Sequence, residues 1–149
     1  MLIHELTISQ CQDVLGRVTL ARLACARHDQ PYVVPVNVYF NREEECLYAF
    51  STVGRKITWM RANPKVCLEL DEITDQFNWT TIVIFGRYEE VGDSTQGGDR
   101  HQAALELFRQ RPTWWQPAAA KVVGAEEHPS PVVYRIRIER MTGRRAARG

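Results

Sequence analysis

Hydrophobic and polar residues alternate along much of this chain with the period of two that is typical of β-strands. The clearest example is the segment 32–40, whose even-numbered positions are all apolar or aromatic. These positions predict a face directed at a hydrophobic core: Tyr32, Val34, Val36, Val38 and Phe40. The opposite face carries Pro35 and Asn37, two residues that are unusual in the middle of a strand.

Five other segments predict strands from alternation or from their content of β-branched and aromatic residues: 17–27, 46–51, 66–71, 79–91 and 131–139. Turn-forming residues at 28–31 indicate that the first of these forms a hairpin with 32–40. Gly86 lies within a long strand and predicts a bulge or bend. A polar loop is expected at 74–78.

Three short helices complete the pattern. Thr7 or Ser9 caps the first, which ends at Gly16. The second covers 55–62 and ends at Asn63-Pro64, and the third covers 101–109. Helices inserted between six antiparallel strands, without one-for-one alternation, predict a mainly β protein. We therefore expect a closed or partly split antiparallel barrel of six strands, and not a parallel βαβ sheet.

Composition adds the domain organisation. The chain has 149 residues, 44% hydrophobic and 25% charged, which is ordinary for one folded domain. We assign this domain to residues 1–141 and predict that the arginine-rich segment 142–149 is a frayed, solvated tail. Contact of these arginines with an anion is the less favoured alternative.

Charge and candidate metal ligands mainly exclude functions. A formal net charge of +1 gives no general attraction to nucleic acid or to membrane surfaces. Apolar runs are too short to cross a membrane, and no leader pattern begins the sequence, so we expect a cytoplasmic protein. The four cysteines and four histidines are dispersed, which predicts neither a metal site nor a disulfide scaffold.

The segment 48–64 carries the most specific chemistry. It joins a strand to a helix through Ser51, Thr52 and Gly54, and places Arg55 and Lys56 at the first helical positions. Unpaired amides at a helix N-terminus, two cations and hydroxyl donors together suit the phosphate of a mononucleotide. In the alternative interpretation a hydroxyl caps the helix and the two cations are solvated. The local chemistry favours neither interpretation over the other. The sequence contains neither a Walker nor a Rossmann glycine motif, so a nucleoside triphosphate or a Rossmann dinucleotide is not expected.

Pro35 and Asn37 are a second, weaker indication of a ligand. A proline within a strand favours an edge, a bulge or an adjacent ligand, and a buried asparagine needs partners. The amide-like edge of an isoalloxazine ring would provide such partners. From these residues alone we favour a bulge, with Asn37 bonded to nearby backbone.

The ordered segments GRVTLARLACARHDQPYVVPVNVYF, LYAFSTVGRK, NPKVCLEL and NWTTIVIFGRYEEV resemble the FMN-binding split-barrel family related to pyridoxamine 5'-phosphate oxidase. The resemblance covers residues 8 to about 91 and is greatest to short members of the nitroimidazole-resistance type. It implies a six-stranded antiparallel split β-barrel of the Greek-key type. It also implies a homodimer that holds FMN at the subunit interface, with Arg55 and Lys56 on its phosphate. The other contacts that it implies are Val34, Pro35, Val36, Asn37, Phe50, Ser51 and Thr52, with Trp79 and Thr81 from the partner chain.

Two departures limit the activity that the resemblance implies. Phe50 stands where relatives of the nitroimidazole-resistance type commonly have a histidine, and the substrate-gripping C-terminal segment of true pyridoxamine phosphate oxidases is not evident. We therefore expect an FMN-dependent oxidoreductase acting on an unidentified small molecule, with no catalytic residue assigned. The alternatives are a nonenzymatic flavin or haem protein and an F420-dependent reductase. Trp114 and Trp115 form either an aromatic lid or, as we favour, part of the packing against the barrel.

Overall fold

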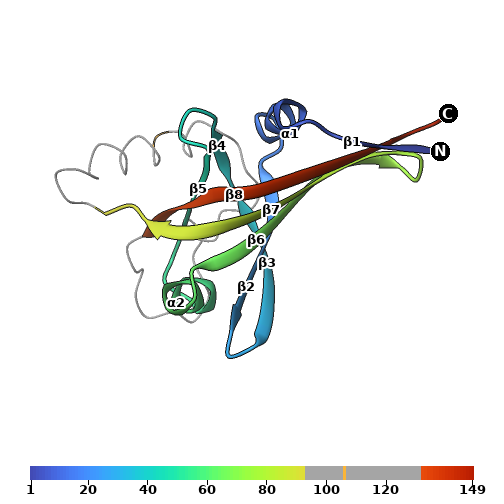
Figure 1. Cartoon of the computed structure of the whole chain (residues 1–149). Helices are drawn as coiled ribbons and strands as arrows, with labels where there is room; N and C mark the ends of the chain where they lie inside the picture. Colours follow the sequence, from blue (N-terminus) through green and yellow to red (C-terminus); the bar gives the residue numbers. More distant parts are fainter. Residues whose placement is uncertain (93–105, 107–131) are drawn as a thin grey trace.

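A single curled antiparallel sheet with two short helices dominates the structure, a computed structural model that describes residues 1–92, 106 and 132–149 (Figure 1). The helices are α1 (Ile8–Leu15) and α2 (Arg55–Ala62). The strands are β1 (Leu2–Glu5), β2 (Leu20–Arg27), β3 (Gln30–Asn37), β4 (Tyr39–Asn41), β5 (Cys46–Ser51), β6 (Lys65–Asp75), β7 (Asn78–Glu90) and β8 (Val132–Ala147).

The order of the strands makes the sheet curl. It runs β3-β2-β6-β7-β8-β5-β4, with β1 added beside the end of β8. Its two edge strands, β3 and β4, are consecutive in the chain and are separated only by Val38, whose amide donates to the carbonyl of Thr19 at 2.8 Å. The two edges must therefore approach each other without pairing. A split barrel is confirmed, although the described residues form eight strands where we expected six.

The core lies on the concave side of this sheet and includes the face predicted for segment 32–40. Val36 and Val38 are 5% and 3% exposed, and the three other predicted positions pack against the same cluster. α2 closes one end of the barrel by packing on β2 (Figure 1). Its Ile57 and Met60 are fully buried, and the helix ends at Asn63 as expected.

Several local predictions are also confirmed. Thr7 caps α1, because its hydroxyl accepts from the amide of Gln10 at 3.2 Å while the Gln10 side chain accepts from the amide of Thr7. The pairing of β7 with β8 shifts at Phe85/Gly86. A side chain at Gly86 would lie 2.6 Å from the carbonyl oxygen of Arg137, so this bulge requires glycine.

The expected frayed tail is wrong for most of its length. β8 continues to Ala147 and pairs there with both β1 and β7, while Gly143 and Ala146 are buried. The expected loop at 74–78 is also shorter, because β6 extends to Asp75. Together these strand ends form an arm that carries both termini away from the body (Figure 1). The predicted third helix, apart from Glu106, and the Trp114–Trp115 pair lie outside the described residues.

Candidate functional site

Within the described residues, the N-terminus of α2 is open and has no side-chain cap. Gly54 is the N-cap residue and accepts from the amide of Thr58 at 3.0 Å through its carbonyl, but no described side chain bonds the first-turn amides. A Cβ added to Gly54 would meet no atom within 4 Å. The interpretation in which Ser51 or Thr52 caps this helix is therefore wrong. The amides remain available to an external acceptor.

Arg55 and Lys56 begin this helix without a carboxylate partner in the described part of the chain. The Arg55 guanidinium carbon lies 5.4 Å from the centre of the Tyr32 ring, a cation–π contact that leaves its donors free. Lys56 is half-buried, and this burial lowers the pKa of its ammonium group below the ordinary value, with an opposing effect of nearby Cys25. An anion at this position would offset that desolvation.

The three predicted contact residues at the end of β5, Phe50, Ser51 and Thr52, differ in what they present. Ser51 is fully buried, and its hydroxyl donates to the carbonyl oxygen of Thr52 at 2.9 Å. Phe50 points to the other side of β5, where it packs with Cys46, Tyr48 and Val133. The Thr52 side chain is half-buried. Unlike Ser51 it is not fully enclosed, and unlike Phe50 it does not belong to that cluster.

β3 provides an unpaired polar group beside a free strand edge. It is an edge strand that pairs only with β2 in the described sheet, which explains how it accommodates Pro35. The Nδ2 atom of Asn37 is buried and has no hydrogen-bond partner in the part of the chain that the structure describes, contrary to our expectation of a bond to nearby backbone. Val36 is core-facing, so only its backbone is able to touch a ligand, while Val34 is half-buried.

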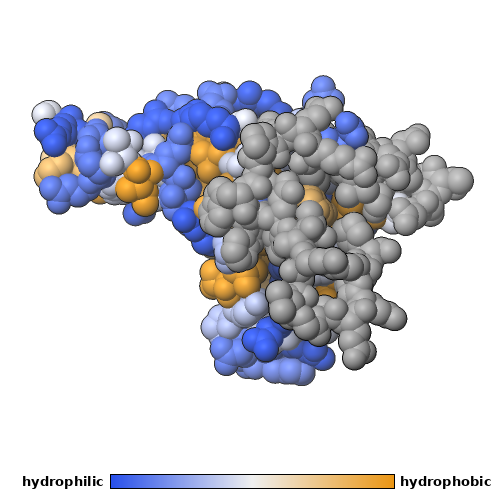
Figure 2. All heavy atoms as spheres, turned by 180° about the vertical axis from the view of Figure 1, so that it is seen from behind, coloured by the Kyte–Doolittle hydropathy of each residue, from blue (hydrophilic) through white to orange (hydrophobic). Residues whose placement is uncertain are grey.

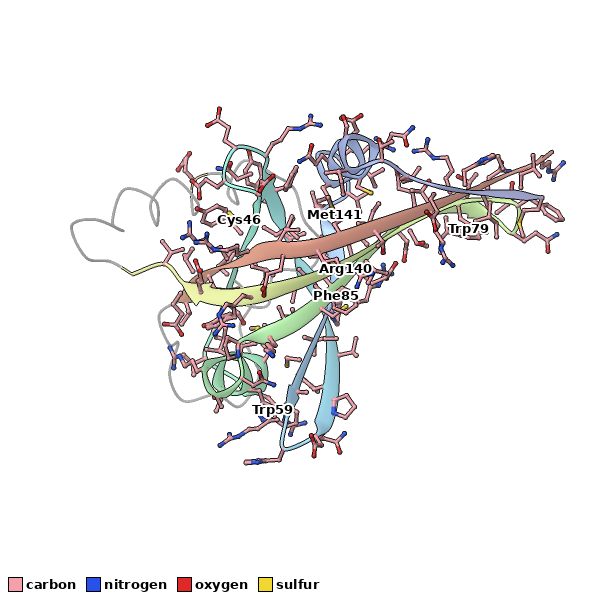
Figure 3. All side chains as sticks on the ribbon, viewed as in Figure 1. Cys46, Trp59, Trp79, Phe85, Arg140 and Met141 are labelled. Carbon is pink, nitrogen blue, oxygen red and sulfur yellow. The ribbon has the colours of Figure 1, made fainter. Side chains whose placement is uncertain are left out.

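Trp79 lies on β7 toward the arm, away from α2 in the same chain (Figure 3), and Thr81 follows two residues later on the same strand. They nevertheless share the outer, convex face of the sheet with Pro35. On this face, direct cross-strand pairs form one row across the sheet: Pro35 with Arg22, Arg22 with Glu69, Glu69 with Val83, and Val83 with Thr142. Three strand spacings separate Pro35 from Val83, roughly 14 Å. One chain therefore does not bring the two predicted halves of the site together.

The same face contains a charge cluster that the sequence analysis missed. Arg22 contacts the carboxylates of Asp71 and Glu69 at 2.9 and 3.8 Å. Burial and a hydrogen bond with Asp71 raise the pKa of Glu69 to about 7. Glu69 and Asp71 are two residues apart on one strand, a spacing that places both on one face, but their cation comes from β2 and depends on strand register.

A groove on the outer face lies between β7, β8 and the end of β1. Its volume is about 510 Å³, and it is lined by Glu5, Leu6, Thr81, Val83, Arg140, Met141, Thr142, Gly143 and Arg144. Arg140 and Phe85 point to the same side of the sheet and Met141 to the other (Figure 3). Of the predicted site residues, Thr81 alone lines this groove.

Other kinds of site have little support in the described residues. No group of three histidine, cysteine, aspartate or glutamate residues within 1–92, 106 and 132–149 is arranged to hold a metal ion. Both α-helices of this part have eight residues and lack the length and apolar character of a membrane span.

Comparison with known proteins assigns the chain to a family. The family model described as pyridoxamine 5'-phosphate oxidase matches residues 7–145. This chain belongs to that family, as its sequence resemblance indicated.

Similarity to individual proteins extends over almost the whole chain. The uncharacterized protein RA0666 of Rhizobium meliloti (strain 1021) is 38% identical over an alignment of 155 positions that covers 100% of this chain and 99% of that protein. A crystal structure described as a FAD-binding protein (mll6688) from Mesorhizobium loti is 39% identical, with a TM-score of 0.83 and coverage of 99% and 100%.

A third similarity concerns the fold alone. A proposed 5-nitroimidazole antibiotic resistance protein from Bacteroides thetaiotaomicron is 17% identical, with a TM-score of 0.67, over 97% of this chain and 89% of that one.

Proposed function

We propose that this protein binds FMN noncovalently and acts as a flavin-dependent oxidoreductase on a small molecule. The observation that carries the proposal is the pair Arg55 and Lys56 at an open, uncapped helix N-terminus, with no carboxylate of the described residues to neutralise either cation. A phosphate there would accept from backbone amides and from two cationic side chains at once.

The residues present fit the rest of a flavin as well. Tyr32, which lies beneath Arg55, and Asn37 are five positions apart on β3, roughly 17 Å along the strand. An elongated ligand that follows this free edge would reach from the cations to the unpartnered Asn37 amide. The amide-like edge of a flavin ring supplies the acceptor that Asn37 Nδ2 lacks.

A second copy of the chain would complete the site. Exposed hydrophobic residues lie on the outer face that Pro35 and Thr81 share: Val33, Ile73 and Phe85 are 61%, 67% and 49% exposed. Val33 and Phe85 belong to one cross-strand row through Ala24 and Cys67. Apolar surface is also visible on the arm and near the middle of the molecule (Figure 2). Burial of this face in a homodimer would bring Trp79 and Thr81 to the partner's cofactor.

The chain's own residues would position the cofactor and tune its surroundings. When bound, a flavin supplies hydride and electron transfer. Arg55 and Lys56 would hold its phosphate, Asn37 would orient the ring edge, and the apolar face would exclude water. No residue of the site is assigned as a catalytic acid or base.

The first experiment is a titration of the flavin-free protein with FMN. Wild type is expected to bind, and Arg55→Ala with Lys56→Ala is expected to lose about 1.5 to 3 kcal/mol of binding free energy for each side chain. Arg61→Ala is the matched control, because this cation lies on the same helix but pairs with Glu90. Wild-type affinity in the double variant would mean that the phosphate site is elsewhere.

FAD is the second candidate cofactor, because the Mesorhizobium loti relative is described as a FAD-binding protein. The same titration with FAD decides between them. Tighter binding of FAD than of FMN would replace FMN in the proposal. Absorption spectra of the purified protein distinguish a flavin from haem or F420.

Enzymatic activity and dimerisation have separate tests. Rapid bleaching of the flavin by NADH or NADPH, with recovery in air, is expected of an oxidoreductase, and its absence with every reductant would favour a storage or sensing protein. Light scattering is expected to give a dimer at micromolar concentration. A monomer under those conditions would contradict the two-chain site.

A further inference from the structure

The groove between β7 and β8 contains two arginines whose charges are not neutralised by ion pairs. Arg140 and Arg144 both line it, and neither forms a salt bridge within the described residues. The Arg140 guanidinium carbon lies 5.9 Å from the centre of the Phe85 ring. Other arginines of β8 differ: Arg135 and Arg137 contact carboxylates, and Arg145 donates to the Thr80 hydroxyl.

The remaining lining defines what the groove would accept. Val83 provides apolar surface, and Thr81 and Thr142 provide hydroxyl groups, while Leu6 and Met141 direct their side chains to the core side of the sheet. Glu5 is the one carboxylate among the lining residues, so the two arginines leave a net positive charge. The volume of about 510 Å³ is within the range of small-molecule sites.

We propose that this groove binds a small organic carboxylate with an apolar body, and that such a molecule is the substrate of the flavin site. Arg140 and Arg144 pair with the carboxylate, while Val83 contacts the body of the molecule. The assignment as substrate rests on the proposed function, because Thr81 of this groove is also the residue expected to approach the partner's flavin. Binding of the carboxylate itself does not depend on flavin.

The geometry explains why these arginines are suited to a ligand. They are four residues apart on one strand, so both project from the outer face, and Thr142 lies between them on that face. Contact with the Phe85 ring orients the Arg140 guanidinium without using its hydrogen-bond donors. The donors of both side chains therefore remain available for a planar carboxylate.

Calorimetric titration with benzoate and benzamide tests the proposal. The full-length protein is used after removal of any bound flavin and again with FMN added. Benzoate is expected to bind, and its affinity is expected to exceed that of the neutral benzamide by about tenfold or more. Equal affinities would overturn the proposal, because the arginines would then have no part in recognition.

Three single variants locate the binding site. Arg144→Gln is expected to weaken benzoate binding about tenfold, and Glu5→Gln is expected to strengthen it, since it removes the competing carboxylate. Arg148→Gln is the matched control, because Arg148 lies over the Phe77 ring and outside the groove. An equal loss in Arg148→Gln and Arg144→Gln would overturn the proposal in favour of general charge attraction.

The flavin measurement separates this inference from the proposed function. Arg144→Gln is expected to keep wild-type FMN affinity, whereas Arg55→Ala with Lys56→Ala is expected to lose FMN and keep benzoate binding. If benzoate binds and no flavin does, carboxylate recognition stands and its assignment as substrate fails. If flavin binds and benzoate does not, the groove proposal alone is overturned.

Discussion

The starts of β8 and α2 each carry a pair of cations, and carboxylates of the described residues neutralise only the pair on β8. Arg135 and Arg137 at the start of β8 bond Glu89, and Arg135 also contacts Glu44 at 3.1 Å. Arg55 and Lys56 at the start of α2 have no such partners in the described residues. In the sequence both pairs are simply adjacent or alternating basic residues. The difference indicates that pairing, rather than the number of charges, identifies cations that are free to bind a ligand.

Removal of a paired cation is expected to have the largest effect on stability. Arg135→Ala breaks contacts with Glu44 and Glu89 at a side chain that is only 18% exposed. We expect the free energy of unfolding to fall by about 1.5 to 3 kcal/mol, measured by urea denaturation. Arg137→Ala is the control, with a smaller loss because this side chain is 54% exposed. A stability unchanged by Arg135→Ala would remove the contrast between the two pairs.

Arg22 is an intermediate case, one cation between two carboxylates, and it predicts a pH dependence. Glu69 has a pKa of about 7 in the folded protein, above its ordinary value of 4.5. Between these values the folded state keeps a proton that the unfolded state has released, so stability falls as the pH rises. We expect a loss of about 1 kcal/mol across that window, since solvent screens a carboxylate that is 36% exposed.

Glu69→Gln isolates this contribution. Urea denaturation at several pH values is expected to give a flatter profile between about 4.5 and 7 than in wild type. The same slope in both proteins would assign the dependence to another group.

An unpaired cation is expected to respond in the opposite direction. Lys56→Met removes a half-buried charge without breaking an ion pair, so the free energy of unfolding is expected to rise by about 0.5 kcal/mol. FMN affinity is expected to fall in the same variant. A loss of stability comparable to that of Arg135→Ala would mean that Lys56 has a structural role.

The smallest effect is expected for an ion pair at the surface. Arg42 and Asp13 are 3.2 Å apart, but their side chains are 53% and 60% exposed. Arg42→Ala is expected to change stability by about 0.2 kcal/mol, within the error of thermal denaturation. A clear shift of the melting temperature would show that this contact fixes α1 on the sheet.

Local physics made much of the fold predictable. The alternation of segment 32–40, the cap of α1 and the proline after α2 each act over a few residues, and each prediction is confirmed. β1 and the end of β8 form through mutual pairing at opposite ends of the chain. Four residues at the N-terminus and an arginine-rich C-terminus carry no strong local signal, so this pairing was missed.

The candidate site was predictable in residue type but not in orientation. Arg55 and Lys56 lie at a helix N-terminus, as the strand-to-helix pattern of segment 48–64 indicates. Whether Ser51 or Phe50 faces the core depends on the register of β5 with β8, where Ser51 pairs with Val132. From the sequence, Arg140 and Arg144 were placed at the end of the domain and in its tail. The groove that they line could not be predicted, because it also requires residues of β7 and of the N-terminus.

The single residue between β3 and β4 limits how proteins built this way are able to diverge. A one-residue insertion at Val38 would displace one sheet edge against the other and reverse the faces of the positions in β4. Changes of length are more easily accommodated at the Asp75–Asn78 turn. New ligand preferences on this scaffold would therefore arise by exchange of side chains, or at that turn, while the distance between its edges stays constant.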